Sequence, residues 1–196
     1  MILTNDQLWL AFFSFSLGIW AKYADLVNEH GMTPAFKGAK LLSGFLWGFS
    51  GTGMIYFSPL GGLTYIAHVL YWFLKIKLEY PNHAIAGVIM VLSGFYFQGE
   101  FLTLYKNDLL GVFFAYTLTG YIQSYFKQHY PITRPFWRLR LRIYLIPVVY
   151  AFYRTSLDPI IATSFGMIAC EFMTYRFRAY KEDILNLNKN LSYVQS

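Results

Sequence analysis

The sequence predicts an all-α fold, a polytopic transmembrane helix bundle of about seven spans, with the N-terminus outside and the C-terminus in the cytoplasm. Three observations support this prediction. Of the 196 residues, 56% are hydrophobic and 13% are charged, whereas soluble domains carry roughly 25% charged residues. The apolar residues form stretches close to the length of a membrane span. Lysine and arginine are concentrated in alternate loops between these stretches, as the positive-inside rule requires.

The apolar stretches are the expected transmembrane helices. A helix needs roughly 17 to 25 mostly apolar residues to cross a hydrocarbon core of ~30 Å. Seven stretches meet or approach this length, and the fourth and sixth are the shortest. The first is expected to be a span and not a cleavable signal peptide, because Lys22 stands at its C-terminal edge and no basic residue precedes it. The stretches are Leu8–Tyr23, Leu41–Phe57, Leu60–Ile76, Ala84–Phe97, Leu109–Phe126, Ile143–Tyr153 and Pro159–Tyr175.

The loop charges indicate the orientation of the chain. The first, third and fifth loops and the C-terminal tail are rich in Lys and Arg, and the fifth loop holds five of them between Lys127 and Arg142. Basic loops stay in the cytoplasm, so these four segments are expected there. The net charge of +6 then reflects topology and contact with anionic membrane lipids. No nucleic-acid partner is expected.

Residues 1–180 are expected to form a single transmembrane domain, and residues 181–196 a cytoplasmic tail. In the tail, apolar residues recur at helical spacing among polar ones between Ile184 and Val194. This pattern is typical of an amphipathic helix that lies in the membrane interface. A disordered polar tail is the alternative.

The order of the stretches allows a 3+1+3 arrangement, in which two sets of three spans form a parallel repeat around a fourth. Pro59 and Pro159 then stand at matching positions, at the start of the third and seventh spans. Residue identity along this alignment is close to background, so the repeat rests on the layout alone. The layout is similar to that of the seven-span sugar transporters with a proline-glutamine loop motif, but this sequence lacks the motif.

Small residues recur in the second stretch. At positions i and i+4 of a helix, such residues let a neighbouring backbone approach closely. We expect tight helix packing there, and a hinge or a helix that lines a substrate cavity is the alternative. The small residues are Ser43, Gly44, Gly48, Ser50, Gly51 and Gly53.

Carboxylates, imidazoles and lysines are expected to gather at the cytoplasmic edge of the bundle. They end the first stretch and follow the third, where Pro81 predicts a turn. Because carboxylate oxygens bind divalent cations and lysine neutralises phosphate, a divalent cation could be held there on a phosphate or diphosphate headgroup. Ordinary interfacial charges in water are the alternative. The candidates for catalysis are Asp25, Glu29, Glu79 and His83, and Lys77 is a candidate for substrate binding.

Glu171 lies inside the last apolar stretch, several residues before its basic end. An ionisable side chain in hydrocarbon costs roughly 2.5 to 3.5 kcal/mol on insertion scales, so it should face the bundle interior or a watery cavity. His68, inside the third stretch, is the expected buried partner. Glu171 is therefore a candidate catalytic carboxylate and His68 a candidate substrate ligand, with a purely structural pair as the alternative.

The fifth loop contains K-x6-R-P from Lys127 to Pro135, which resembles the opening motif of the membrane-associated type 2 phosphatidic acid phosphatases. In that family the lysine and arginine hold the substrate phosphate, which implies this role for Arg134. The later histidine-containing motifs of the family are missing, because no histidine follows His129. The resemblance covers one short motif, so we assign the chain to no family. Arg134 stays a candidate phosphate ligand in a basic loop that faces anionic headgroups.

Aromatic residues make up 21% of the chain. Several fall near the expected interfaces, where aromatic belts form. A pocket for a lipid tail or an aromatic ligand is the alternative. The residues considered are Trp9, Trp20, Tyr71, Trp72, Tyr121 and Tyr125.

Three classes of function fit these observations. The first is a membrane enzyme that acts on a lipid or polyprenyl phosphate at the cytoplasmic face, and the polar residues at that edge favour it. The second is a small-solute transporter with parallel three-helix repeats. The third is a non-catalytic subunit of a membrane complex, or a homo-oligomer. The membrane itself is that of a bacterial or archaeal cell, or of an organelle.

Overall fold

The computed structural model describes residues 3–74, 80–97, 99–130 and 141–194. All regular structure in these ranges is α-helical, in seven helices without a strand, so the all-α fold class is confirmed. Each helix overlaps one of the seven predicted stretches. The helices are α1 (Asn5–Glu29), α2 (Ala39–Phe57), α3 (Pro59–Leu74), α4 (Pro81–Phe97), α5 (Gly99–His129), α7 (Leu141–Arg154) and α8 (Asp158–Val194).

Local sequence signals explain where several helices begin. The Thr4 hydroxyl accepts a hydrogen bond from the Gln7 backbone N–H, and the Gln7 side chain accepts one from the Thr4 N–H, each at 3.2 Å. This reciprocal capping satisfies two backbone donors at the start of α1. α4 begins at Pro81, a position where proline is favoured because the first N–H of a helix has no intrahelical partner. The chain therefore starts a new helix at Pro81, where the sequence predicted a turn.

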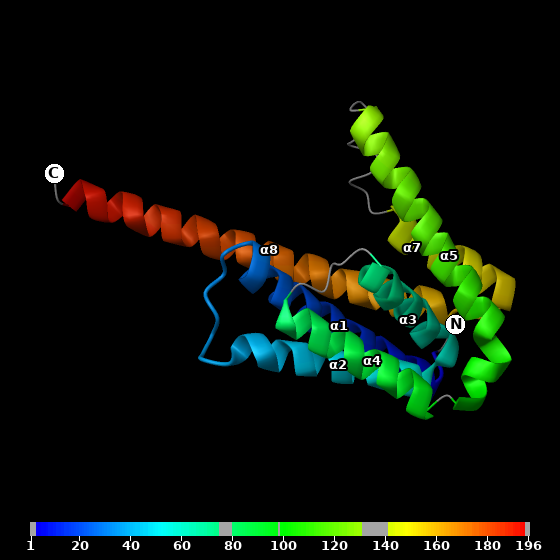
Figure 1. Ribbon diagram of the computed structural model, residues 1–196. Coiled ribbons are helices and arrows are strands. Elements are labelled where there is room, and N and C mark those ends of the chain that lie inside the picture. The colour runs from blue at the N-terminus through cyan, green and yellow to red at the C-terminus, as the bar shows by residue number, and fades with distance from the viewer. Residues whose placement is uncertain (1–2, 75–79, 98, 131–140, 195–196) are drawn as a thin grey trace.

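α1 lies at the centre of one part of the bundle (Figure 1). α1 lies between α2 and α8, and α2 also packs against α4. α3 joins the two parts of the bundle because it contacts α2, α5 and α8. One buried cluster, which includes Leu10, Trp47 and Met90, fills the space among α1, α2, α4 and α8. A second, which includes Tyr71 and Tyr116, lies among α3, α5 and α7.

The small residues of α2 allow α4 to approach closely, so the packing predicted from them is confirmed. A Cβ atom added to Gly44 would lie 2.5 Å from the Asn82 carbonyl oxygen. A Cβ atom added to Gly48 would lie 2.8 Å from Cβ of Ile89. Both distances are shorter than a van der Waals contact, so side chains at these positions would push the two helices apart.

The two sets of three helices do not pack alike. α1 and α2 are in contact over much of their length, whereas α5 and α7 meet over a shorter stretch of the described residues. α5 also departs from helical geometry at Tyr105, with φ −115° and ψ 16°. The second pair of each set, α2 with α3 and α7 with α8, is in comparable contact, so the repeat stays a prediction.

The tail is part of the last helix. α8 runs without interruption from Asp158 to Val194, which is 37 residues. Its C-terminal part points away from the other helices (Figure 1). Residues 181–194 thus extend α8 as helix, and an interfacial position of this tail stays a prediction.

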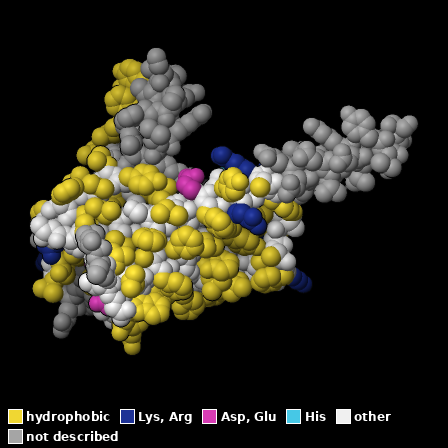
Figure 2. All heavy atoms as spheres, turned by 180° about the vertical axis from the view of Figure 1, so that it is seen from behind, with side chains coloured by type: hydrophobic (Ala, Val, Ile, Leu, Met, Phe, Trp, Pro, Cys, Tyr) yellow, Lys and Arg dark blue, Asp and Glu magenta, His cyan; other side chains and the backbone are white. Residues whose placement is uncertain are grey.

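Among the described helices, α1 is long enough and apolar enough to cross a membrane by length and composition. The helices Pro81–Phe97 and Ile143–Arg154 are apolar but shorter. One such helix is weak support for a membrane location, because core helices of soluble proteins and signal sequences share its length and composition. Figure 2 shows a broad face of the molecule covered by hydrophobic side chains, with few charged groups among them.

Candidate functional site

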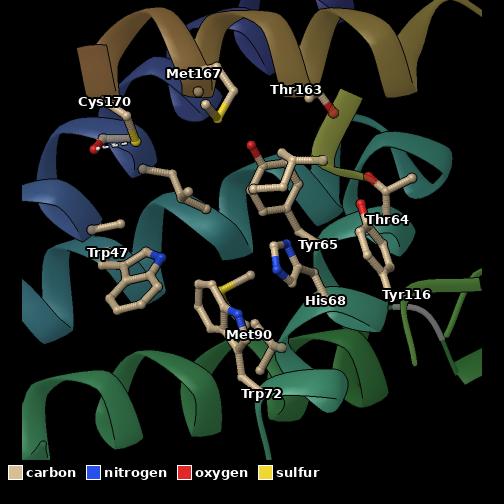
Figure 3. A pocket seen from close by; sticks show the side chains of 16 residues that line it. Trp47, Thr64, Tyr65, His68, Trp72, Met90, Tyr116, Thr163, Met167 and Cys170 are labelled. Carbon is tan, nitrogen blue, oxygen red and sulfur yellow. Dashed lines mark hydrogen bonds between the residues drawn. The ribbon is translucent and has the colours of Figure 1, made fainter. Parts of the chain in front are cut away.

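A cavity of about 140 Å³ lies where the helices converge. Each of the seven described helices contributes at least one residue to its wall. Figure 3 shows the side chains of Trp47, His68, Trp72, Thr163 and Cys170 among those that line it. The cavity is therefore a product of the whole bundle and not of one helix pair.

His68 lies in an aromatic part of the cavity wall. Its ring is stacked on Tyr116, with centroids 4.7 Å apart and an interplanar angle of 11°. The Trp72 ring is also 4.7 Å away, and the His68 side chain is buried, with 9% exposure. The candidate substrate ligand His68 thus faces the central cavity, and Trp72 shares this wall instead of lying in an interfacial belt.

Polar groups of the cavity wall donate hydrogen bonds to backbone carbonyls. The Thr64 hydroxyl donates to the Gly61 carbonyl at 2.7 Å. The Cys170 thiol donates to the Gly18 carbonyl at 3.4 Å. Because these donors are directed at the helices themselves, most of the surface that the cavity offers to a ligand is carbon or aromatic ring.

The placement predicted for Glu171 is wrong. Its side chain is exposed on α8, beside Phe172, which is 51% exposed. Cys170 points to the cavity instead, and the next residue of a helix is rotated by about 100° from it. Glu171 therefore does not face His68, and the expected buried pair between them does not form.

A second group of polar residues lies at the C-terminal end of α1. Ligand atoms of Asp25, Glu29 and His30 all lie within 4.8 Å of one another. Lys22 Nζ is 2.5 Å from Asp25 Oδ2, and His30 Nε2 is 3.9 Å from the same oxygen. Asp25 is half-buried, whereas Glu29 and His30 are exposed. These three side chains, the α1 cluster, are the described residues that have the geometry to hold a metal ion.

The end of α1 meets the start of α4, as the sequence predicted for the two groups of polar residues. Asn28 Nδ2 donates to Asn82 Oδ1 at 2.9 Å and lies 3.5 Å from His83 Nε2. His83 is buried, at 8% exposure, and its ring packs edge-on against Trp47 at 5.3 Å. The structure thus brings His83 to the helix end that carries Asp25 and Glu29, through Asn28.

The α1 cluster and the cavity are adjacent. Ala21 lines the cavity and stands four residues before Asp25, which corresponds to about 6 Å along a helix. Trp47 lines the cavity and also contacts His83. A polar edge therefore lies about one helical turn from an apolar interior. The other candidates, Lys77, Glu79 and Arg134, lie outside the described residues.

Two further carboxylates, at the opposite end of α1, join helices together. Asp158 accepts hydrogen bonds from the Gln7 amide at 3.0 Å and from the Ser58 hydroxyl at 2.7 Å. Asp108 accepts a hydrogen bond from Tyr150 at 2.8 Å. It also pairs with Arg154, whose Nε lies 3.3 Å from Asp108 Oδ2. The sequence did not reveal these contacts, because each one links residues from distant parts of the chain.

Comparisons with protein families, with curated proteins and with solved structures found no match. The candidate site is therefore interpreted from its own geometry. Its two parts are an aromatic cavity at the centre of the bundle and the α1 cluster beside it.

Proposed function

We propose that the chain is a polytopic membrane protein in which all the described helices are spans. The supporting observation is the outer surface, where every described helix exposes large apolar side chains. On α3 they are confined to its C-terminal end, at Phe73 and Leu74. Soluble proteins rarely expose continuous apolar patches larger than a few hundred Å², and a bilayer would cover these residues. Examples are Phe49 at 61%, Leu92 at 62%, Phe114 at 62%, Leu118 at 62%, Val149 at 59% and Phe152 at 78% exposure.

The contacts between helix ends agree with spans that alternate in direction. If α1 starts outside, then Gln7, Ser58 and Asp158 all belong to the outer end, and they are in contact. Asn28 and Asn82 belong to the inner end, and they are in contact as well. With the Lys-rich and Arg-rich loops in the cytoplasm, the α1 cluster lies at the cytoplasmic face.

For the biochemical activity, we propose an enzyme that acts on a lipid or polyprenyl phosphate at the cytoplasmic face. The observation that carries this proposal is the α1 cluster, formed by Asp25, Glu29 and His30, about one helical turn from an apolar cavity. An amphiphile has the same organisation, because its anionic headgroup stands next to an apolar chain. Hard divalent cations take carboxylate oxygens and phosphate oxygens as ligands, so one cation would join the cluster to the headgroup.

Each residue has a defined task in this proposal. Asp25, Glu29 and His30 hold the cation. Lys22 partly offsets the negative charge of Asp25, which keeps the cluster from repelling a phosphate before the cation arrives. His83 is a candidate acid-base group, held by Asn28 and Trp47. The cation supplies charge neutralisation at the phosphate, which is the usual part of such ions in phosphoryl chemistry.

The experiment uses the full chain purified in detergent. Mn²⁺ binding is measured by titration, and release of inorganic phosphate is measured from phosphatidic acid vesicles and from farnesyl phosphate. We expect Asp25→Asn to weaken Mn²⁺ binding at least about tenfold, because a charged oxygen ligand is lost. Asp6→Asn is the matched control, since Asp6 is an exposed carboxylate at the other end of α1.

Turnover decides the enzymatic part. We expect Asp25→Asn and His83→Ala to lose phosphate release from whichever substrate the wild type hydrolyses, while Asp6→Asn keeps it. If both variants turn over substrate at the wild-type rate, the assignment of this site is wrong. If the wild type releases phosphate from neither substrate in the presence of Mn²⁺ or Mg²⁺, the phosphatase activity tested here is excluded.

A further inference from the structure

The central cavity has a size, a wall and a set of hydrogen bonds that together define a ligand. We propose that it is a binding site for one flat, apolar ring of about six carbon atoms, the size of benzene. This proposal needs neither the cation nor the phosphate, so it goes beyond the activity at the cytoplasmic face. If experiments contradict the enzymatic activity, the proposal for the cavity is unaffected, and the reverse also holds.

The volume of the cavity matches that of a small ligand. Protein interiors are close-packed, and voids larger than a water molecule are few. The cavity has a volume of about 140 Å³, close to the roughly 150 Å³ of an engineered apolar cavity that stays dry and takes up benzene. One six-membered ring matches such a volume.

The wall favours a flat occupant. Trp47 and Trp72 meet at 69° with ring centroids 5.7 Å apart, so two walls of the cavity are aromatic and steeply inclined to each other. His68 and Tyr116 add a stacked pair. Figure 3 shows Trp47, His68 and Trp72 around the same space. These rings contact one another, so a flat ligand lies against their free faces and edges, where offset-stacked and edge-to-face contacts are worth more than their buried area alone.

The hydrogen bonds of the wall favour an apolar occupant. A buried water needs two to four polar partners. Three polar groups of the wall already donate to backbone carbonyls: Thr64 to Gly61, Tyr65 to Ala162 and Cys170 to Gly18. The wall also holds the ring nitrogen atoms of His68 and the Thr163 hydroxyl, but most of its exposed surface is apolar. A polar solute would therefore lose more hydrogen bonds to water than it regains, whereas an apolar ring loses none.

Cys170 provides a direct readout of occupancy. It lines the cavity and is the only cysteine in the chain. The experiment measures the rate at which methyl methanethiosulfonate modifies the purified full-length protein, with increasing benzene in the buffer. We expect saturating benzene to slow modification at least about tenfold, because the ring blocks the thiol. Cyclohexane, which is similar in size but not flat, should protect less, since it cannot stack on the aromatic walls.

Matched variants test whether benzene slows the modification of Cys170 by binding in this cavity. Thr163 lines the cavity, whereas Thr174 lies on the same helix away from it. Thr163→Phe puts a ring into the space and should make modification of Cys170 slow whether or not benzene is present. Thr174→Phe should keep the benzene dependence of the wild type. Thr163→Met, with a flexible side chain that adapts to irregular space, serves if the phenylalanine variant does not fold.

Two results would overturn the proposal. One is a wild-type modification rate that benzene leaves unchanged up to its solubility limit. The other is protection by benzene in a folded Thr163→Phe or Thr163→Met protein with the same concentration dependence as in the wild type, because the ligand would then bind elsewhere.

Discussion

The two ends of the bundle use carboxylates in different ways. At the end that the proposed topology puts outside, called the outer end, Asp158 and Asp108 accept hydrogen bonds from residues of other helices and so join those helices. At the end that the same topology puts in the cytoplasm, called the cytoplasmic end, Asp25 pairs with Lys22 of its own helix, and Glu29 is exposed. Helix contact at that end depends on amides and glycines instead. Carboxylates that bond to other helices thus serve stability, whereas those of the α1 cluster make no hydrogen bond to another helix within the described part of the chain and are the ones that we propose bind a ligand.

The largest effect on stability is expected from Asp158→Ala. The change removes the acceptor of two hydrogen bonds and leaves the Ser58 hydroxyl, which is 2% exposed, without its charged partner. Hydrogen bonds to charged groups contribute about 1.5 to 3 kcal/mol each, so we expect a loss of about 3 kcal/mol. Thermal unfolding in detergent measures it. An unchanged midpoint would show that Asp158 does not hold the outer end together.

The next largest effect is expected from Gly44→Ala. The added Cβ would lie 2.5 Å from the Asn82 carbonyl oxygen, so α2 and α4 must separate. Overpacking of this kind costs about 1 to 3 kcal/mol. Gly111→Ala is the control, because nothing lies within 4 Å of its added Cβ. Equal unfolding midpoints for the two variants would contradict close packing at the cytoplasmic end.

Tyr150→Phe tests the second carboxylate of the outer end. It removes the hydrogen bond from Tyr150 to Asp108 and leaves the ion pair with Arg154 in place. We expect a loss of about 1 kcal/mol, the typical net value of one hydrogen bond. The midpoint of denaturant unfolding reports it, with Tyr153→Phe as the control because Tyr153 is 71% exposed. A larger loss in Tyr153→Phe would reverse the assignment.

The smallest effect on stability is expected from Asp25→Asn. Partly exposed ion pairs contribute about 0 to 1 kcal/mol, and Asp25 and Lys22 belong to the same helix. The unfolding midpoint should therefore stay close to that of the wild type even though Mn²⁺ binding is lost. A loss of stability as large as that of Asp158→Ala would mean that both ends use carboxylates structurally.

The sequence was most informative about where helices lie along the chain. It was least informative about how each helix is rotated about its own axis. Apolar stretches predicted the helix positions because burial and hydropathy act along the chain, and Pro81 marked a helix start because proline lacks an N–H. Asn28 contacts Asn82 because successive helices alternate in direction, which puts the end of α1 and the start of α4 at the same end of the bundle. Hydropathy gives the depth of Glu171 but not the side of α8 it occupies, so its exposure could not be predicted.

The cavity was beyond the reach of the sequence for a related reason. Its wall combines Trp47, Tyr116 and Thr163, which come from three helices separated by many residues. Each of these side chains by itself has the appearance of an ordinary residue of an apolar helix. Only the relative placement of the helices turns them into one site, and a single sequence carries no direct record of that placement.

The length of α8 has a mechanical consequence. Its 37 residues correspond to about 55 Å, whereas the hydrocarbon core is about 30 Å thick. In the proposed topology, roughly 25 Å of the same rod stands in the cytoplasm. Because Thr163 and Cys170 belong to this rod and line the cavity, a force that tilts or rotates its cytoplasmic end also moves the cavity wall. In that topology, movement of the far end of α8 would be transmitted along one continuous helix to the residues that line the cavity.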